Sequence, residues 1–183
     1  MQEELFLLII AGVKSERMGK DKALIDYKGK PHIFFLAKLL SPYCNKILIS
    51  RNKEQAPLNE KNHKIDYEII FDDESSENQG PLTGLISAIK QFPHENFITI
   101  YCDLINIDET LIQILINERD TNKYATCFIT NDFPEPSIVI FESKANQILL
   151  EKYASGKYSI IKFLKEHDCK YITLDKTLID KDE

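Results

Sequence analysis

The six residues from Leu5 to Ile10 are all apolar, and a short basic loop that contains Gly12 and Gly19 follows them at once. An apolar run of this length, bounded by turn-forming residues, predicts a strand that is buried on both faces. Such strands are typical of parallel sheets with helices on both sides. In an open sheet of this kind, ligands bind beyond the carboxyl ends of the strands. The start of the chain therefore predicts an α/β fold with a candidate ligand loop directly after its first strand.

Further apolar, β-branched runs alternate with segments of helical period. The predicted strands are 46–50, 67–71, 97–102, 124–129, 137–141 and 170–174. The predicted helices are 33–40 with Pro31 in the first turn, 82–89 after Pro81, 111–118 after an Asp108 N-cap, 144–154 and 159–167. This alternation favours parallel pairing through right-handed crossovers. We therefore expect a three-layer α/β/α fold with a mostly parallel, twisted sheet.

One connection breaks the alternation. Only residues 130–136 separate the predicted strands 124–129 and 137–141. That gap is too short for a helical crossover, because parallel neighbours need a connection of a dozen or more residues. We therefore expect one antiparallel strand in the sheet.

Composition limits the classes of protein to consider. A chain of 183 residues with 43% hydrophobic content fits a single domain, 1–183, whose polar end from about 175 is expected to fray. The net charge of -6 and the pI near 5.3 argue against a nucleic-acid partner. No apolar stretch approaches the roughly 20 residues that cross a bilayer, and the acidic start is unlike a secretory signal. We expect no membrane partner and a cytoplasmic location.

Cysteine and histidine give no sign of a metal centre. The four cysteines are scattered without a Cys-x-x-Cys pair, and the four histidines show no ligand spacing. We expect reduced thiols in or near the core.

Three polar segments follow predicted strands. The first combines Arg17, Lys20 and Lys22 with glycine, the second ends in Asp103, and the third is Asp72-Asp73 followed by Gly80-Pro81-Leu82-Thr83-Gly84. Each has an ordinary structural reading as well: a solvated loop, a turn, and an acidic loop before a helix. In a parallel sheet, however, all three meet at one edge. Their convergence favours a site for a phosphorylated ligand and a hard cation.

These motifs resemble those of the molybdenum cofactor guanylyltransferases, a branch of the nucleotidyltransferase superfamily with a Rossmann-like fold. The family's Leu-Ala-Gly-Gly-x-Ser-x-Arg-Met-Gly-x-Asp-Lys corresponds to residues 10–22. The likeness continues through Gly29-Lys30-Pro31, Gly80-Pro81-Leu82-Thr83-Gly84, Cys102-Asp103, Pro136 and Ser155-Gly156-Lys157-Tyr158-Ser159, so it covers about residues 5–167. Gly12 favours the guanylyl branch, since cytidylyl relatives tend to carry alanine there.

The resemblance implies an activity and a set of site residues. The reaction would transfer GMP from GTP to molybdopterin and release pyrophosphate, with Mg²⁺ as the cofactor. The implied contacts to the nucleotide are Ile10, Ala11, Gly12, Lys22 and Asp73, together with Asp103, which would also bind the metal. Arg17, Lys22 and Asp103 would be catalytic. Other proteins of molybdenum cofactor biosynthesis, or proteins that accept the cofactor, would be the partners.

The chain also departs from the family pattern. Val13 replaces the second glycine, Ser50 stands where some members carry asparagine, and Ile105 replaces a proline. The family's late Asn-x-Asn-Thr-Pro segment has no counterpart up to Glu183. Two other functions therefore stay open: a nucleotidyltransferase for CTP or another phosphorylated acceptor, and a nucleotide- or partner-binding module without turnover.

Overall fold

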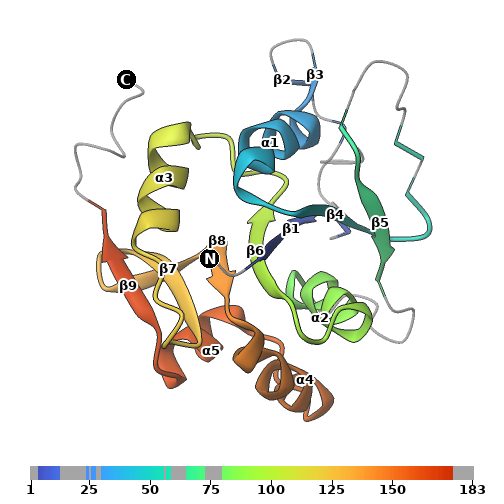
Figure 1. The fold of residues 1–183 in the computed structure, drawn as a ribbon. Helices are drawn as coiled ribbons and strands as arrows, with labels where there is room; N and C mark the ends of the chain where they lie inside the picture. The colour runs from blue at the N-terminus through green and yellow to red at the C-terminus, as the bar shows by residue number, and fades with distance from the viewer. Residues whose placement is uncertain are drawn as a thin grey trace.

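The structure is a computed structural model that describes residues 4–12, 24, 26–27, 30–55, 57–58, 65–72 and 80–174. In these residues the strands are β1 (Leu5–Ile10), β2 (Asp26–Tyr27), β3 (Lys30–Pro31), β4 (Lys46–Arg51), β5 (Glu68–Phe71), β6 (Asn96–Tyr101), β7 (Ala125–Thr130), β8 (Phe133–Phe141) and β9 (Lys170–Thr173). Seven of them form one twisted sheet in the order β5-β4-β1-β6-β8-β7-β9 (Figure 1), and β2 pairs with β3 in a separate ribbon.

Strand β8 is antiparallel to both of its neighbours, β6 and β7, whereas the other pairs of the large sheet are parallel. The expected antiparallel strand is therefore confirmed. It begins at Phe133, earlier than predicted, because Asn131 and Asp132 both adopt positive φ and close a two-residue hairpin turn. Pairing with β6 runs only from Ile138 to Phe141, so Pro134 lies where β8 faces β7 alone. Pro134 is tolerated there because proline has no backbone N–H to donate to a strand on the other side.

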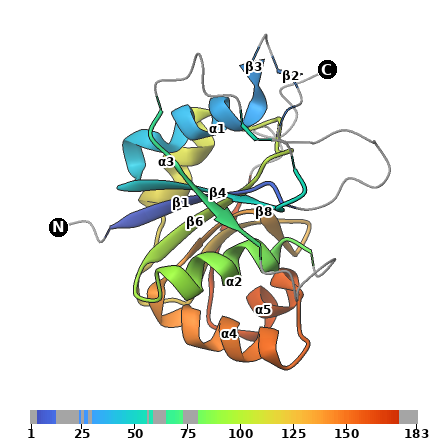
Figure 2. The ribbon, with the colours of Figure 1, turned by 90° about the vertical axis from the view of Figure 1, so that its right-hand side faces the viewer.

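Helices cover both faces of the sheet (Figure 2), as the three-layer prediction requires. Helices α1 (His32–Leu40) and α3 (Glu109–Asn117) pack on one face, and α2 (Leu82–Gln91), α4 (Asn146–Ala154) and α5 (Ile160–Glu166) pack on the other. Two short 3₁₀ turns, Ser41–Tyr43 and Ser143–Ala145, complete the described elements. The central strand β1 serves both cores, since Leu7 and Ile9 face one cluster and Leu8 and Ile10 face the other.

The structure confirms one of the predicted helix starts and shifts two others. Asp108 caps α3 as predicted, because its Oδ1 accepts a hydrogen bond from the Leu111 amide at 2.9 Å. Pro31 introduces α1 as expected, but it is the N-cap residue before the first turn and not part of that turn. It also pairs with Asp26 in the β2–β3 ribbon. The predicted helix 144–154 starts as a 3₁₀ turn and becomes α-helical only from Asn146.

All four cysteines are free thiols in or near the core, as expected. Burial raises the pKa of Cys44 and Cys127 to about 12 and that of Cys169 to about 11. These thiols are therefore protonated and unreactive at neutral pH. Among the described residues no helix is long and apolar enough to span a bilayer.

Candidate functional site

The carboxyl ends of β5, β4, β1 and β6 lie side by side, and backbone hydrogen bonds extend the ladder beyond the strands. The amide of Ala11 donates to the Ser50 carbonyl at 3.1 Å, that of Asp72 to the Arg51 carbonyl at 3.0 Å, and that of Cys102 to the Ile10 carbonyl at 3.1 Å. Register is therefore kept at the point where the chain leaves the sheet. This edge holds Ile10, Ala11 and Gly12 next to Asp72, with Asp103 one residue beyond Cys102.

The carboxylate of Asp72 lies at the centre of a tightly packed polar cluster. Its Oδ1 accepts a hydrogen bond from the Ser50 hydroxyl at 2.7 Å, and the Ser50 side chain is fully buried. A Cβ atom on Gly12 would lie 2.0 Å from the other carboxylate oxygen, Oδ2. A Cβ atom on Gly84 would lie 2.4 Å from Ser50 Oγ and 2.9 Å from Ser50 Cβ. The absence of side chains at Gly12 and Gly84 thus lets the segment after β1 lie against Asp72 and lets α2 lie against Ser50.

The side chain of Gln55 fastens the segment after β4 to the segment after β1. Its Nε2 donates to the Ala11 carbonyl at 2.9 Å, and its Oε1 accepts from the Asn52 amide at 2.7 Å. The backbone of Ala11 is therefore held on two sides, by Ser50 and by Gln55. These contacts fix the backbone of Ala11 at the point where the chain leaves β1.

Burial raises the pKa of Asp72 from 3.8 to about 6, although the hydrogen bond from Ser50 opposes this change. The carboxylate of Asp72 therefore binds its proton more tightly in the folded state than in the unfolded state. The stabilisation that this proton gives is complete below the unfolded pKa, and it is lost as pH rises through about 6. A rise from 3.8 to about 6 corresponds to about 3 kcal/mol at most, at about 1.4 kcal/mol per pKa unit.

Asp72→Asn is expected to gain about 1.4 kcal/mol of stability relative to the parent protein as pH rises from 5 to 8, because the rest of the pH-dependent stabilisation is already lost below pH 5. The amide resembles the neutral acid and still accepts from Ser50, but it carries no buried charge at high pH. Urea unfolding at both pH values measures the difference. Asp66→Asn, which removes an exposed carboxylate before β5, is the matched control. An Asp72→Asn difference that stays constant with pH would contradict the assignment.

At the end of β6, Asp103 presents an exposed carboxylate. Burial raises the pKa of the neighbouring Tyr101, and the charges of Glu135 and Asp103 raise it further. Both carboxylates therefore act on the same phenol. In the described part of the chain no group of three His, Cys, Asp or Glu residues could hold a metal ion. Mg²⁺ needs only one or two protein carboxylates when substrate phosphates supply the other ligands, so Asp103 fits such an ion.

Of the predicted site residues, the structure brings Ile10, Ala11, Gly12 and Asp103 to one edge of the sheet. Arg17, Lys22 and Asp73, together with Val13, lie outside the described residues. Asp72 and Asp73 form one of the polar segments expected from the sequence, and the family resemblance implies a contact only for Asp73; the structure shows Asp72 against Gly12. Gln55 carries no sequence motif, because its partner Ala11 lies 44 residues away in the sequence.

Comparisons with known proteins agree with this picture. A family model, the MobA-like NTP transferase domain, matches residues 7–170. A molybdenum cofactor biosynthesis bifunctional protein of Synechocystis sp. is 33% identical over 95% of this chain and 49% of its own length. The chain thus spans about half the length of that relative. A molybdenum cofactor guanylyltransferase of Pseudomonas putida is 27% identical over 86% of this chain and 81% of its own length.

Solved structures show the same fold. Molybdopterin-guanine dinucleotide biosynthesis protein A from Archaeoglobus fulgidus superposes with a TM-score of 0.71 at 20% identity, over 97% of this chain and 87% of that one. A CMP:2-keto-3-deoxy-manno-octonic acid synthetase complexed with CTP superposes with a TM-score of 0.67 at 12% identity, over 94% and 90%. This chain therefore shares the α/β fold of both proteins.

Proposed function

The chain belongs to the MobA-like NTP transferase family, and from this premise we propose that it transfers GMP from GTP to molybdopterin and releases pyrophosphate. The observation that carries the proposal is the packing of Gly12 against Asp72, at the same edge of the sheet that carries Asp103. The relative from Pseudomonas putida, named a molybdenum cofactor guanylyltransferase, supports the choice of substrates.

In the proposed complex, the backbone at Ile10, Ala11 and Gly12 holds the guanine nucleotide. The lack of a side chain at Gly12 lets the loop lie against Asp72. Asp73 is a further nucleotide contact, while Lys22 and Arg17 meet the phosphates and offset their charge. Asp103 contacts the nucleotide and is the proposed Mg²⁺ ligand. When bound, that ion neutralises charge on the triphosphate and on the leaving pyrophosphate.

The proposed chemistry is a single displacement at phosphorus. An anionic oxygen of the terminal phosphate of molybdopterin forms a bond to the α-phosphorus of GTP, and the bond to pyrophosphate breaks. The attacking oxygen is already charged, so the protein supplies neither a covalent nucleophile nor a general base. Its residues orient the two substrates and stabilise charge at the triphosphate.

Purified protein incubated with GTP, MgCl₂ and molybdopterin is expected to yield pyrophosphate and a guanine dinucleotide. Asp103→Asn should lower the rate about 100-fold. Removing one group that stabilises the transition state typically costs about 3 kcal/mol, which corresponds to a rate loss of this size. Phosphate release coupled to a pyrophosphatase measures the rate, and chromatography identifies the dinucleotide. Asp66→Asn, an exposed carboxylate before β5, should leave the rate unchanged.

A panel of nucleotides tests the choice of GTP independently of turnover. A ligand that binds only the folded state raises the melting temperature. We expect GTP with Mg²⁺ to raise it more than CTP does. Greater stabilisation by CTP, or no dinucleotide from folded protein, would contradict the proposal. We further propose a cytoplasmic reaction whose product passes to other proteins of cofactor biosynthesis or to proteins that accept the cofactor.

A further inference from the structure

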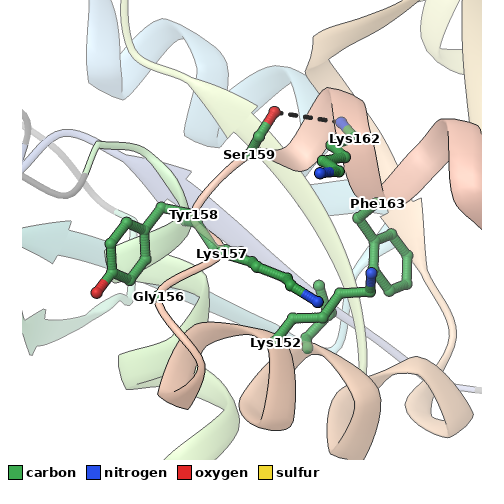
Figure 3. A pocket seen from close by; sticks show the side chains of 9 residues that line it. Lys152, Gly156, Lys157, Tyr158, Ser159, Lys162 and Phe163 are labelled. Carbon is green, nitrogen blue, oxygen red and sulfur yellow. Dashed lines mark hydrogen bonds between the residues drawn. The ribbon is translucent and has the colours of Figure 1, made fainter.

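A cavity of about 240 Å³ lies between the start of α2, the end of α4 and the first turn of α5 (Figure 3). Its walls include none of the residues assigned to the nucleotide. Buried apolar side chains of Leu82, Leu149 and Phe163 line one part of it. The volume is below the roughly 300–1,000 Å³ of pockets that enclose whole ligands, so the cavity suits one chemical group of a ligand.

Three lysines line the same cavity: Lys152, Lys157 and Lys162. Figure 3 shows the Lys157 side chain extending towards Lys152. The Lys152 ammonium lies 2.7 Å from one oxygen of Glu166, and that of Lys162 lies 3.7 Å from the other. The charges of all three lysines lower the pKa of Glu166. Three cations therefore surround a carboxylate that can neutralise only one of them.

The loop that carries these lysines is held in place by local contacts. Gly156 adopts a φ of +78° and ends α4, with the Lys157 amide donating to the Lys152 carbonyl at 2.9 Å. This left-handed residue turns the chain, so Lys157 follows the end of α4 closely. The rings of Tyr158 and Tyr153 meet edge to face at 5.0 Å, and the Tyr153 hydroxyl hydrogen-bonds with Thr83 of α2 at 3.3 Å. These contacts hold the loop that forms one wall of the cavity.

A hydroxyl group adds a hydrogen-bond donor to this set. Ser159 lines the cavity, and its Oγ accepts a hydrogen bond from the Lys162 amide at 3.2 Å. That bond does not use the hydroxyl proton, which can point to an anion. Two excess positive charges and a hydroxyl donor match a phosphate dianion, which has charge of the same size and several acceptor oxygens.

We propose that this cavity is a second phosphate-binding site, which takes a phosphate dianion through Lys152, Lys157, Lys162 and Ser159. Free inorganic phosphate and the terminal phosphate of a phosphorylated acceptor share this chemistry. The site adjoins Leu82, the first residue of α2, and Gly84, two residues further along the same helix, packs against Ser50 next to Asp72. Only the second source of the phosphate rests on the proposed function.

Titration of the isotope-labelled protein with inorganic phosphate tests the site by NMR. We expect the amide signals of residues 156–162 to shift, and Lys157→Gln or Lys162→Gln to weaken the apparent affinity at least about tenfold, the equivalent of about 1.4 kcal/mol. Lys38→Gln, at an exposed lysine of α1 on the other face of the sheet, is the matched control and should change nothing. Added NaCl should weaken binding, because the attraction is electrostatic.

A variant that removes a negative charge, and is expected to tighten binding instead of weakening it, strengthens this test. Glu166→Gln removes the carboxylate that competes with the anion for Lys152 and Lys162. We expect it to tighten phosphate binding, which the loss of a merely structural ion pair would not do. The proposal is overturned if phosphate shifts no signal in residues 156–162, or if neither lysine variant nor Glu166→Gln changes the affinity.

Kinetics then identify the source of the phosphate. If the site holds the phosphate of the acceptor, Lys157→Gln should raise KM for molybdopterin and leave KM for GTP unchanged. If it holds free phosphate alone, both KM values should stay the same while the NMR shifts persist. Failure of the proposed function is distinguishable, because dinucleotide synthesis would then be absent while phosphate still shifts the signals of residues 156–162.

Discussion

Gly12→Ala is expected to lower kcat/KM for GTP about 100-fold while the protein stays folded. The new Cβ would lie 2.0 Å from Oδ2 and 2.9 Å from Cγ of Asp72, and 3.3 Å from the Asn52 amide nitrogen. The carboxylate must rotate away and give up its hydrogen bond from Ser50, or the loop after β1 must move. A displacement of about 1 Å in a reacting group can cost about 100-fold in rate. Pyrophosphate release measures the rate, and far-UV circular dichroism checks the fold.

A double-mutant cycle tests whether the contact with Asp72 causes this loss. Asp72→Ala removes the two carboxylate atoms that the new Cβ would meet most closely and leaves only the longer contact with the Asn52 amide nitrogen. Gly12→Ala combined with Asp72→Ala should therefore be no slower than Asp72→Ala alone, because the two changes act on one contact. If the two losses simply multiply, the loss at Gly12 has another cause.

Glu142→Ala is expected to lower the free energy of unfolding by about 3–5 kcal/mol, the usual cost of leaving one partner of a buried ion pair alone. Arg119 donates to the two carboxylate oxygens of Glu142 through Nε and Nη2, each at 2.7 Å. The two side chains are only 8% and 3% exposed. Urea unfolding at neutral pH gives the change directly.

An exposed ion pair provides the control for this measurement. Lys46 and Glu68 also lie 2.7 Å apart, but 38% and 45% of their side chains are exposed. Glu68→Ala should therefore cost about 1 kcal/mol or less. Similar losses for Glu142→Ala and Glu68→Ala would mean that burial of the Arg119–Glu142 pair does not govern its contribution.

The strands and helices were predictable because their signals are local. Continuous apolar runs such as Leu5–Ile10, and the Asp108 cap, need no knowledge of the rest of the chain. The first half of β8 was missed because Pro134 and Pro136 argue against a strand. The structure accommodates Pro134 by letting β8 extend beyond its pairing with β6. Pro31 introduces α1 but lies before its first turn, where the β2–β3 ribbon pairs the same residue.

The candidate site was predictable only in outline. Parallel pairing brings the ends of β1, β5 and β6 to one edge, and this could be expected from the order of the elements. Whether Asp72 or its neighbour faces Gly12 depends on the register of β5 with β4, which the sequence does not contain. Gln55 acts through a contact with Ala11, 44 residues away in the sequence, so no spacing rule identifies it.

Gly84 packs so closely against Ser50 that the size of the side chain at one of these positions limits the size at the other. A side chain larger than serine at position 50 has no room while α2 keeps its distance from β4, since even a Cβ on Gly84 would meet Ser50 Cβ at 2.9 Å. Relatives with asparagine at position 50 are therefore expected to hold this helix further from the sheet. The separation between α2 and β4 would then vary with the residue at position 50.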